Sequence, residues 1–288
     1  MQLSQSRIRT DLEVLVGPRD PYTNMRALNA AADYVVSELR KAGLAVADET
    51  FQAEGEIFRN IVGTHVGTVA PQEQVLVVAH YDTKPGTPGA DDNASAVAAM
   101  LEIARTLARG RFERTLQFVG FTLEEYGYQG SRRFARQARR ERREIVGVLD
   151  LEMVGFTSPR QRLPHGVRGR RTGDFIGVVG NKRSRSLLEA FVTSARGTVP
   201  ALPVETLVVT WNGHLLPIVR LSDHAPFWDV GFPAVMITDT AFLRNPHYHQ
   251  PSDTLDTLDL PFLTQVATAT VAAAADLARP VTLVSSAA

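Results

Sequence analysis

The fold is decided by the stretch VLVVAHYD at residues 75–82, in which an apolar run ends directly in a histidine and an aspartate. Two further apolar runs of this kind lie at residues 116–121 and 145–149. Near-continuous apolar runs rich in valine are typical of parallel strands that are covered on both faces. We therefore expect three buried strands with polar residues at their carboxyl ends.

Around these runs, helical and strand-like patterns alternate. Helices are expected at residues 25–42, 94–108, 131–143, 184–195 and 261–277, and further strands at 175–179, 204–210 and 234–238. This alternation predicts an α/β fold, in which a mainly parallel mixed sheet is sandwiched between helices. We expect a single domain over residues 1–288, with an irregular surface insertion around residues 157–173. Asn93 or Ser95 is expected to cap the helix at 94–108.

Composition excludes several classes of function. The 288 residues include 31 Lys and Arg, 31 Asp and Glu, and no cysteine. A formal charge of zero provides no global field for nucleic acid or an anionic membrane, and the arginine-rich stretch 132–143 is interpreted as a solvated helix face. Without cysteine, a metal site must use His, Asp and Glu. The first 17 residues lack a signal-peptide pattern and the apolar stretches are too short to span a membrane, so we expect a cytoplasmic protein.

Each of the three strongest strands runs into potential metal ligands. In chain order these are His80-Tyr81-Asp82, Glu124-Glu125 and Asp150-Leu151-Glu152. Parallel strands bring their carboxyl ends to one edge of the sheet, where ligands bind in open α/β folds. Because so many carboxylates in one crevice repel each other, their convergence indicates a bound divalent cation.

Two more segments supply ligand-type residues. The stretch GADDN at residues 89–93 joins the first strand to its helix and can place a carboxylate at the sheet edge. Near the other end of the chain, HYH at residues 247–249 precedes PSDT at residues 251–254. Beside a carboxylate-rich edge, a histidine pair in a turn is expected to contribute to metal binding.

These motifs, taken together, resemble one known family. They are HYD at 80–82, GADDNAS at 89–95, EE at 124–125, EMVG at 152–155, and YH at 248–249 with DT at 253–254. In order, spacing and context they resemble the co-catalytic dizinc aminopeptidases, metallopeptidase family 28, over about residues 80–256. The sequence lacks the competing HExxH, GxSxG and P-loop motifs. The resemblance implies the zinc-exopeptidase fold, which is phosphorylase/hydrolase-like.

The resemblance also implies a set of ligands for two zinc ions, for which cobalt or manganese are alternatives. His80 and Glu152 would bind one ion, Glu125 and His249 the other, and Asp92 would bridge the two. Founding members of the family have Asp where Glu152 stands here, and Glu is also a valid zinc ligand. The family often has a cis peptide after the bridging residue, which here would be Asp92-Asn93.

Three further roles follow from the same resemblance. Asp82 would fix the ring of His80. Glu124 would be the general base that takes the proton of the attacking water, and Tyr248 would donate a hydrogen bond to the tetrahedral oxyanion. The usual glycine after the Ala-Ser pair is Ala96 in this chain, and alanine suits a helix.

The implied activity is removal of N-terminal residues from peptides with a free N-terminus, by a dizinc-bound hydroxide. A glutaminyl cyclase-like acyltransferase, a carboxypeptidase-type relative and a non-catalytic binding module on the same fold remain as alternatives. The sequence does not decide the side-chain preference, the oligomeric state or the native metal. Asp223 is interpreted as the cap of a following helix, with pocket lining as the alternative, and Trp228 and Phe242 as core residues or pocket walls.

Overall fold

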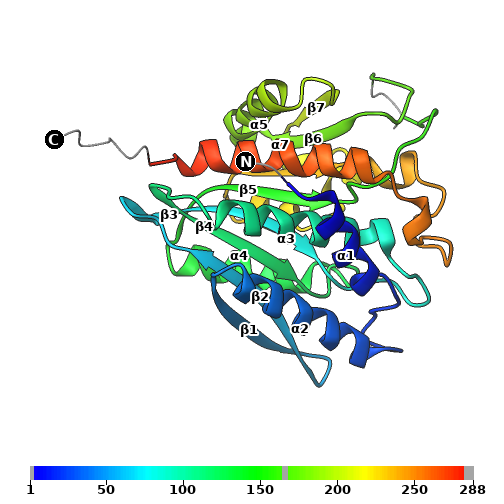
Figure 1. Cartoon of the computed structure of the whole chain (residues 1–288), viewed down its shortest axis with the longest axis horizontal. Coiled ribbons are helices and arrows are strands. Elements are labelled where there is room, and N and C mark those ends of the chain that lie inside the picture. The colour runs from blue at the N-terminus through cyan, green and yellow to red at the C-terminus, as the bar shows by residue number, and fades with distance from the viewer. Residues whose placement is uncertain (1–2, 164–167, 282–288) are drawn as a thin grey trace.

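A computed structural model describes residues 3–163 and 168–281 (Figure 1). Eight strands form one sheet in the order β1-β2-β4-β3-β5-β8-β6-β7. The pairs β3–β4, β3–β5, β5–β8 and β6–β7 are parallel, whereas β1–β2, β2–β4 and β6–β8 are antiparallel, which confirms the mixed, mainly parallel sheet. The strands are β1 Ala45–Ala53, β2 Glu56–His65, β3 Ala70–His80, β4 Arg114–Phe121, β5 Glu144–Glu152, β6 Ile176–Asn181, β7 Val204–Val209 and β8 Ala234–Thr238.

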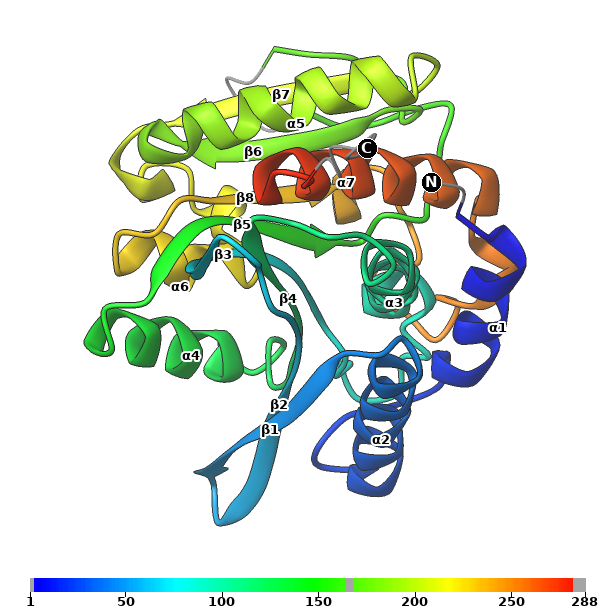
Figure 2. The ribbon, with the colours of Figure 1, turned by 60° about the vertical axis from the view of Figure 1, so that its left-hand side comes forward.

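Helices cover both faces of this sheet (Figure 2). One layer contains α1, α2, α3, α5 and α7, and the other contains α4 and α6. The α-helices are α1 Gln5–Leu15, α2 Met25–Lys41, α3 Ala96–Leu107, α4 Gln129–Arg140, α5 Arg185–Thr198, α6 His224–Asp229 and α7 Leu260–Ala278. Short turns of other helix types are η1 Ala90–Ser95, η2 Lys182–Ser184, η3 Trp211–Gly213, η4 Pro217–Arg220, η5 Ala241–Leu243 and η6 Leu255–Thr257.

The continuous apolar run of β3 reflects burial on both faces of the sheet. Val75 and Val77 pack into the core beneath α3 and α7, while Leu76 and Val78 pack into the second core with α4 and α6. Side chains that alternate along a strand thus reach two separate cores, and both cores require apolar residues. The sequence signal for the central strands is strong for this reason.

The expectation that Asn93 or Ser95 caps α3 is wrong. Ser95 occupies the N-cap position of α3 without a capping hydrogen bond. Instead, its Oγ donates to the Asp91 carbonyl oxygen at 2.7 Å and accepts from the Val154 backbone N–H at 3.1 Å. The Asn93 amide likewise bonds the backbone of β5 and of the residue that follows it. Both side chains therefore fasten the loop before α3 to the end of β5.

Two elements near the N-terminus have no counterpart in the sequence prediction. α1 is short, and its apolar face is limited to Ile8, Leu12 and Leu15 among the buried residues. The hairpin of β1 and β2 forms one edge of the sheet, and β1 consists of exposed and half-buried residues. An edge strand with few buried side chains lacks the apolar run by which the central strands are recognised.

The expectation that every apolar stretch is too short to span a membrane is wrong for α7. This helix is long and apolar enough by length and composition alone. However, 61% of the tested stretch is buried within the protein, where it packs against α3 and α5. The apolar character of α7 is therefore accounted for by its place in the core.

The insertion around residues 157–173 is irregular wherever the structure describes it, and residues 164–167 lie outside the described residues. Its two ends pair through a bridge between Ser158 and Gly173. Gln161 accepts hydrogen bonds from Thr240 Oγ1 at 2.9 Å and from Arg244 Nε at 3.1 Å. The segment is thus attached to the loop that follows β8.

An ion-pair network joins three helices and can be tested by mutation. Arg105 of α3 bonds both carboxylate oxygens of Asp11 at 2.6 and 2.8 Å, and Glu38 at 2.6 Å. Arg105→Met should lower the free energy of unfolding by about 3–5 kcal/mol, because the Asp11 carboxylate stays buried without its cation. The matched control Lys41→Met removes an exposed partner of Glu38 and should cost at most about 1 kcal/mol. Equal shifts of the two variants in urea unfolding would contradict this account.

Candidate metal centre

The parallel strands bring the candidate ligands to one edge of the sheet. His80 is the last residue of β3 and Glu152 the last residue of β5, while Glu124 and Glu125 follow the end of β4. The remaining two candidates come from loops. Asp92 lies in η1, directly before α3, and His249 lies in the loop between η5 and η6. Six side chains from separate segments of the sequence therefore converge at one place.

Four of these side chains surround one point. His80 Nε2 lies 3.4 Å from Asp92 Oδ1, 3.5 Å from Glu152 Oε2 and 3.9 Å from Glu124 Oε2. His80, Glu124 and Glu152 each offer a ligand atom within 4.8 Å of the others. All four side chains are buried, so the group forms a shielded cluster of one imidazole and three carboxylates.

A second cluster adjoins the first through Asp92. The Nε2 atom of His249 lies 3.1 Å from Asp92 Oδ2 and 3.1 Å from Glu125 Oε1. Asp92 thus presents Oδ1 to His80 and Oδ2 to His249. The peptide bond between Asp92 and Asn93 is cis, which confirms that expectation.

The donor atoms fit metal ions better than they fit each other. His80 Nε2, Glu125 Oε1 and His249 Nε2 are buried and form no hydrogen bond among the described residues, although they lie close to oppositely charged groups. Imidazole nitrogens and carboxylate oxygens that face one another without hydrogen-bond alignment are suited to share cations. The residues present therefore fit divalent ions of the zinc type, and they form two candidate groups of ligands.

The shifted pKa values of the clustered side chains also indicate a need for positive charge. Burial opposes protonation of His80, yet Glu124, Asp82 and the other nearby carboxylates outweigh it and raise the pKa of His80 well above its usual value. Burial raises the pKa of Glu152 to about 7 and that of Glu124 well above its usual value. For Asp92, burial acts in the same direction, but the two histidines outweigh it and lower the pKa. Cations at these positions would remove this conflict.

Asp82 lies behind the clusters and supports three of the candidate ligands. Its Oδ1 atom is 3.5 Å from His80 Nδ1, on the side of the ring opposite the first cluster. Its two oxygens accept the backbone N–H groups of Glu124 at 3.1 Å and Glu125 at 3.2 Å. One buried carboxylate therefore orients the histidine and the loop that carries both glutamates.

Sequence reasoning missed two residues that hold candidate ligands in place, one at the loop of Asp92 and one at Glu152. The Asp253 carboxylate accepts the backbone N–H groups of Asp91 at 3.0 Å and Asp92 at 3.2 Å. Ser222 Oγ donates to Glu152 Oε2 at 2.8 Å. Asp253 belongs to the DT motif quoted above, so its sequence context pointed to this region, but not to these contacts.

Arg19 is a further missed residue, and no local pattern indicates its role. Its buried guanidinium donates to the carbonyl oxygens of Tyr81 at 2.9 Å, Pro88 at 3.0 Å and Gly89 at 3.0 Å. Burial lowers the pKa of Arg19 to about 10. The side chain ties the end of β3 to the loop that leads to Asp92, so it fixes the spacing between ligands from two segments.

The interpretation of Asp223 as a helix cap is wrong. It occupies the N-cap position of α6, but its side chain makes no capping hydrogen bond and is fully buried. Trp228 is a core residue, with Nε1 bonded to the Ala234 carbonyl oxygen at 2.8 Å. Phe242 is 40% exposed and lines a cavity, so the pocket-wall alternative holds for it.

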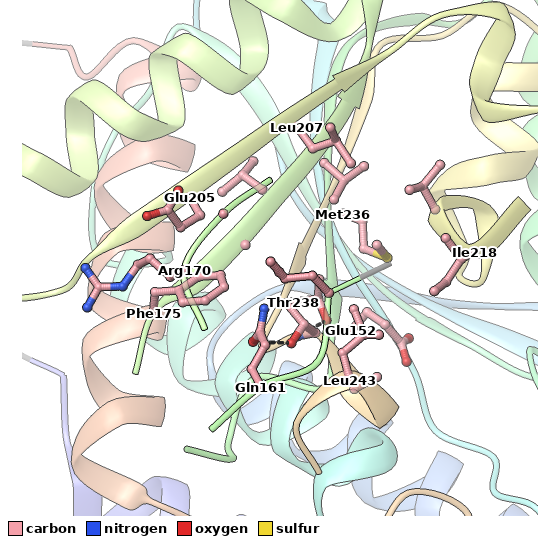
Figure 3. Close-up of a pocket in the computed structure, with 18 of the residues that line it drawn as sticks. Glu152, Gln161, Arg170, Phe175, Glu205, Leu207, Ile218, Met236, Thr238 and Leu243 are labelled. Atoms are coloured by element: carbon pink, nitrogen blue, oxygen red, sulfur yellow. Dashed lines mark hydrogen bonds between the residues drawn. The ribbon is translucent and has the colours of Figure 1, made fainter. Parts of the chain in front are cut away.

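Tyr248 lies between the metal-type clusters and this cavity. Its ring stacks on that of His249, with centroids 3.7 Å apart. The cavity has a volume of about 160 Å³ and is bordered by Glu152, Leu221 and Tyr248, which also border the space over the clusters. Its walls are mainly apolar (Figure 3) and include Leu207, Ile218, Met236 and Leu243.

Comparisons with known proteins identify the family of this chain. The model of peptidase family M28 matches residues 60–274. The uncharacterised protein YfbL of Escherichia coli is 32% identical over 263 residues, which cover 84% of this chain and 78% of YfbL. Leucine aminopeptidase 1 of Arthroderma otae is 26% identical, covering 96% of this chain and 75% of that protein.

Solved structures show the same fold at low sequence identity. A zinc aminopeptidase from Bacillus subtilis has a TM-score of 0.80 at 16% identity, covering 96% of both chains. A glutaminyl cyclase from Porphyromonas gingivalis has a TM-score of 0.73 at 22% identity, covering 95% of this chain and 98% of that chain. These likenesses establish the fold, and the family match covers most of the sequence. The chain belongs to peptidase family M28.

Proposed function

We propose that the protein is a two-zinc aminopeptidase that removes the N-terminal residue from peptides with a free amine. The observation that carries this proposal is the pair of adjoining clusters that share Asp92, one oxygen facing each histidine. His80 and Glu152 would hold one ion, Glu125 and His249 the other, and Asp92 both. Zinc bound there supplies Lewis acidity, which polarises a scissile carbonyl and makes water nucleophilic near neutral pH.

Glu124 is the proposed general base. Of the three carboxylates near His80 Nε2 it is the most distant, at 3.9 Å against 3.4 and 3.5 Å for Asp92 and Glu152, so it is the one most readily left free of metal. Burial raises its pKa well above the usual value, so it is a stronger proton acceptor than an exposed carboxylate. It would take the proton of the attacking water and return it to the leaving amine.

Tyr248 is the proposed donor to the oxyanion. Burial and the surrounding carboxylates raise the pKa of its phenol, so the hydroxyl keeps its proton at neutral pH. The side chain borders both the space over the clusters and the apolar cavity. A phenol at that boundary can donate to the oxygen of a carbonyl whose side chain occupies the cavity.

The apolar cavity is the proposed site for the side chain of the N-terminal residue. Its volume of about 160 Å³ and its walls from β6, β7 and β8 suit a leucine- or phenylalanine-sized group. Glu152, which borders the cavity, and the carboxylates around the space over the clusters would attract the substrate's ammonium group.

A glutaminyl cyclase-like acyltransferase is the second candidate, favoured by the fold it shares with the Porphyromonas gingivalis enzyme. The two clusters are more readily explained by a peptidase with two ions. Mass spectrometry of a peptide that begins with glutamine separates the candidates, since a cyclase removes ammonia and an aminopeptidase removes the residue. A peptide blocked at its amino end would be trimmed only by a carboxypeptidase-type enzyme, and a binding module would change none of these peptides.

Glu124→Gln should lower kcat/KM for leucine amide by about 10²–10⁴-fold, because the proton acceptor is lost while the ligands remain. Zinc content, measured by mass spectrometry, should stay at the wild-type value. The neighbouring variant Glu125→Gln is the matched control and should lose zinc. Near-normal turnover of Glu124→Gln would show that another group accepts the proton.

Asp92→Ala should lower the occupancy of both ions together, because one side chain faces both histidines. His249→Ala should weaken only the second site, so that about one zinc per chain remains. Titration with zinc followed by calorimetry measures the number of sites in each variant. One unaltered site in Asp92→Ala would mean that this residue does not bridge.

Ile218→Trp should narrow the apolar cavity and shift substrate preference toward small residues. Loss of room for one or two methylene groups is expected to reduce kcat/KM for leucine amide by about 10-fold relative to alanine amide. Rates for both amides, measured side by side, give this ratio directly. An unchanged ratio would place the substrate side chain elsewhere.

A further inference from the structure

An arginine-lined groove runs along α4 beside the hairpin of β1 and β2. It has a volume of about 610 Å³. Arg132, Arg136 and Arg140 line it at intervals of four residues, so they form one stripe on the helix. Glu49 and Phe51 of β1 border the opposite side. We call this feature the arginine groove.

The three stripe residues have no ion-pair partner among the described residues. Their neighbours differ in this respect: Arg143 lies 3.7 Å from Glu49 Oε1 and 2.7 Å from Glu141 Oε2, and Arg133 donates to the Gln52 carbonyl oxygen. Like charges four residues apart destabilise a helix by about 0.2–0.5 kcal/mol per pair. Helix stability therefore does not explain the stripe.

The arginine groove lies next to the space over the metal-type clusters. Gly127 borders both the groove and the space over the clusters, and α4 starts two residues later at Gln129. Lys84 marks the same junction, with Nζ 3.3 Å from Glu125 Oε2 and 5.2 Å from the ring centroid of Tyr126. The groove then follows the helix away from the clusters.

Two spaces with different chemistry therefore adjoin the space over the clusters. The apolar cavity adjoins it at Glu152, Leu221 and Tyr248, and its volume suits a single side chain. The arginine groove adjoins it at Gly127 and is several times larger. An aminopeptidase has one residue before the scissile bond and the rest of the peptide after it, which matches one small and one large space.

We propose that the arginine groove binds the part of the substrate that follows the scissile bond and selects carboxylates there; this inference rests on the proposed function. Guanidinium groups bind carboxylates through paired hydrogen bonds. From Gln129 to Arg140 the helix rises by roughly 16 Å, the length of about five extended residues. The carboxylates belong to acidic side chains within that reach, or to the C-terminus of a short peptide.

A peptide fits this groove better than a nucleic acid. The chain has no net charge, so it provides no global field for a phosphate backbone. The groove also adjoins, at Gly127, the space over the proposed site of peptide hydrolysis. Nucleic acid nevertheless provides a distinct outcome for the test.

The test compares hexapeptide amides that begin with Leu-Ala and carry either alanine or glutamate at positions three to five. The zinc-loaded wild type should cleave the glutamate peptide with about 10-fold higher kcat/KM at low salt, and added KCl should reduce this preference. The triple variant Arg132→Glu/Arg136→Glu/Arg140→Glu should lose or reverse it. A tripeptide with a free or an amidated C-terminus shows whether a terminal carboxylate is bound in the same way.

The matched control is Arg139→Glu/Arg183→Glu/Arg185→Glu, which makes the same charge change at exposed positions that do not line the groove. It should keep the preference, and all three proteins should hydrolyse leucine amide at the same rate. Equal loss in the control would assign the effect to overall charge and overturn the inference. Equal rates for the two hexapeptides in a wild type that cleaves leucine amide would refute the inference alone.

Two further outcomes separate the remaining explanations. Failure of the zinc-loaded wild type to cleave leucine amide would refute the proposed function, and the inference with it. A single-stranded oligonucleotide of 20 nucleotides, followed by fluorescence anisotropy, is the second probe. Binding that requires Arg132, Arg136 and Arg140, without any preference between the hexapeptides, would reassign the arginine groove to nucleic acid.

Discussion

Repulsion among buried carboxylates at the carboxyl edge of the sheet is the constraint to which the rest of the structure responds. Asp82, Asp92, Glu124 and Glu152 are all buried within one small region, where burial penalises negative charge. Glu125, with a side chain only 6% exposed, adds to them. Such a concentration of acid is stable only when it is protonated, hydrogen-bonded or neutralised by cations. Ring nitrogens of His80 and His249 have no hydrogen-bond partner in the part of the chain that the structure describes, which favours cations for the innermost groups.

The outer carboxylates of the site are stabilised by hydrogen bonds from the backbone. Asp82 accepts two N–H groups from the loop of Glu124, and Asp253 accepts two from the loop of Asp92. These carboxylates are stabilised by the same bonds that fix the loops, so the cost of burying them is offset while the ligands are oriented. Arg19 adds a positive charge near these carboxylates. Its guanidinium donates to a carbonyl oxygen just after β3 and to one in the loop before Asp92. The charged groups that surround the site therefore also hold its loops in place.

How far the sequence predicts this molecule depends on whether a feature leaves a local pattern. β3 is predictable because its alternating side chains enter two cores, and His80 because it ends that strand. β1 is not, since an edge strand buries few side chains. Arg19 contacts groups more than 60 residues away, and no pattern around it signals those contacts. Asp223 shows the converse error, because a residue placed like a helix cap is instead buried without a capping bond.

The uneven cover of the sheet explains why the two spaces beside the clusters differ. On the side of α5 and α7, helices cover β6 and β8, and the residues there belong to the main core. On the opposite face, Val179 of β6, Leu207 of β7 and Met236 of β8 line the apolar cavity, so the sheet itself supplies its apolar walls. The other space lies against α4, a helix whose buried side is narrow, and this leaves most of its surface to arginine. The chemistry on each side of the clusters thus follows from what covers the sheet: an incompletely covered strand surface presents apolar groups, and an amphipathic helix presents charge.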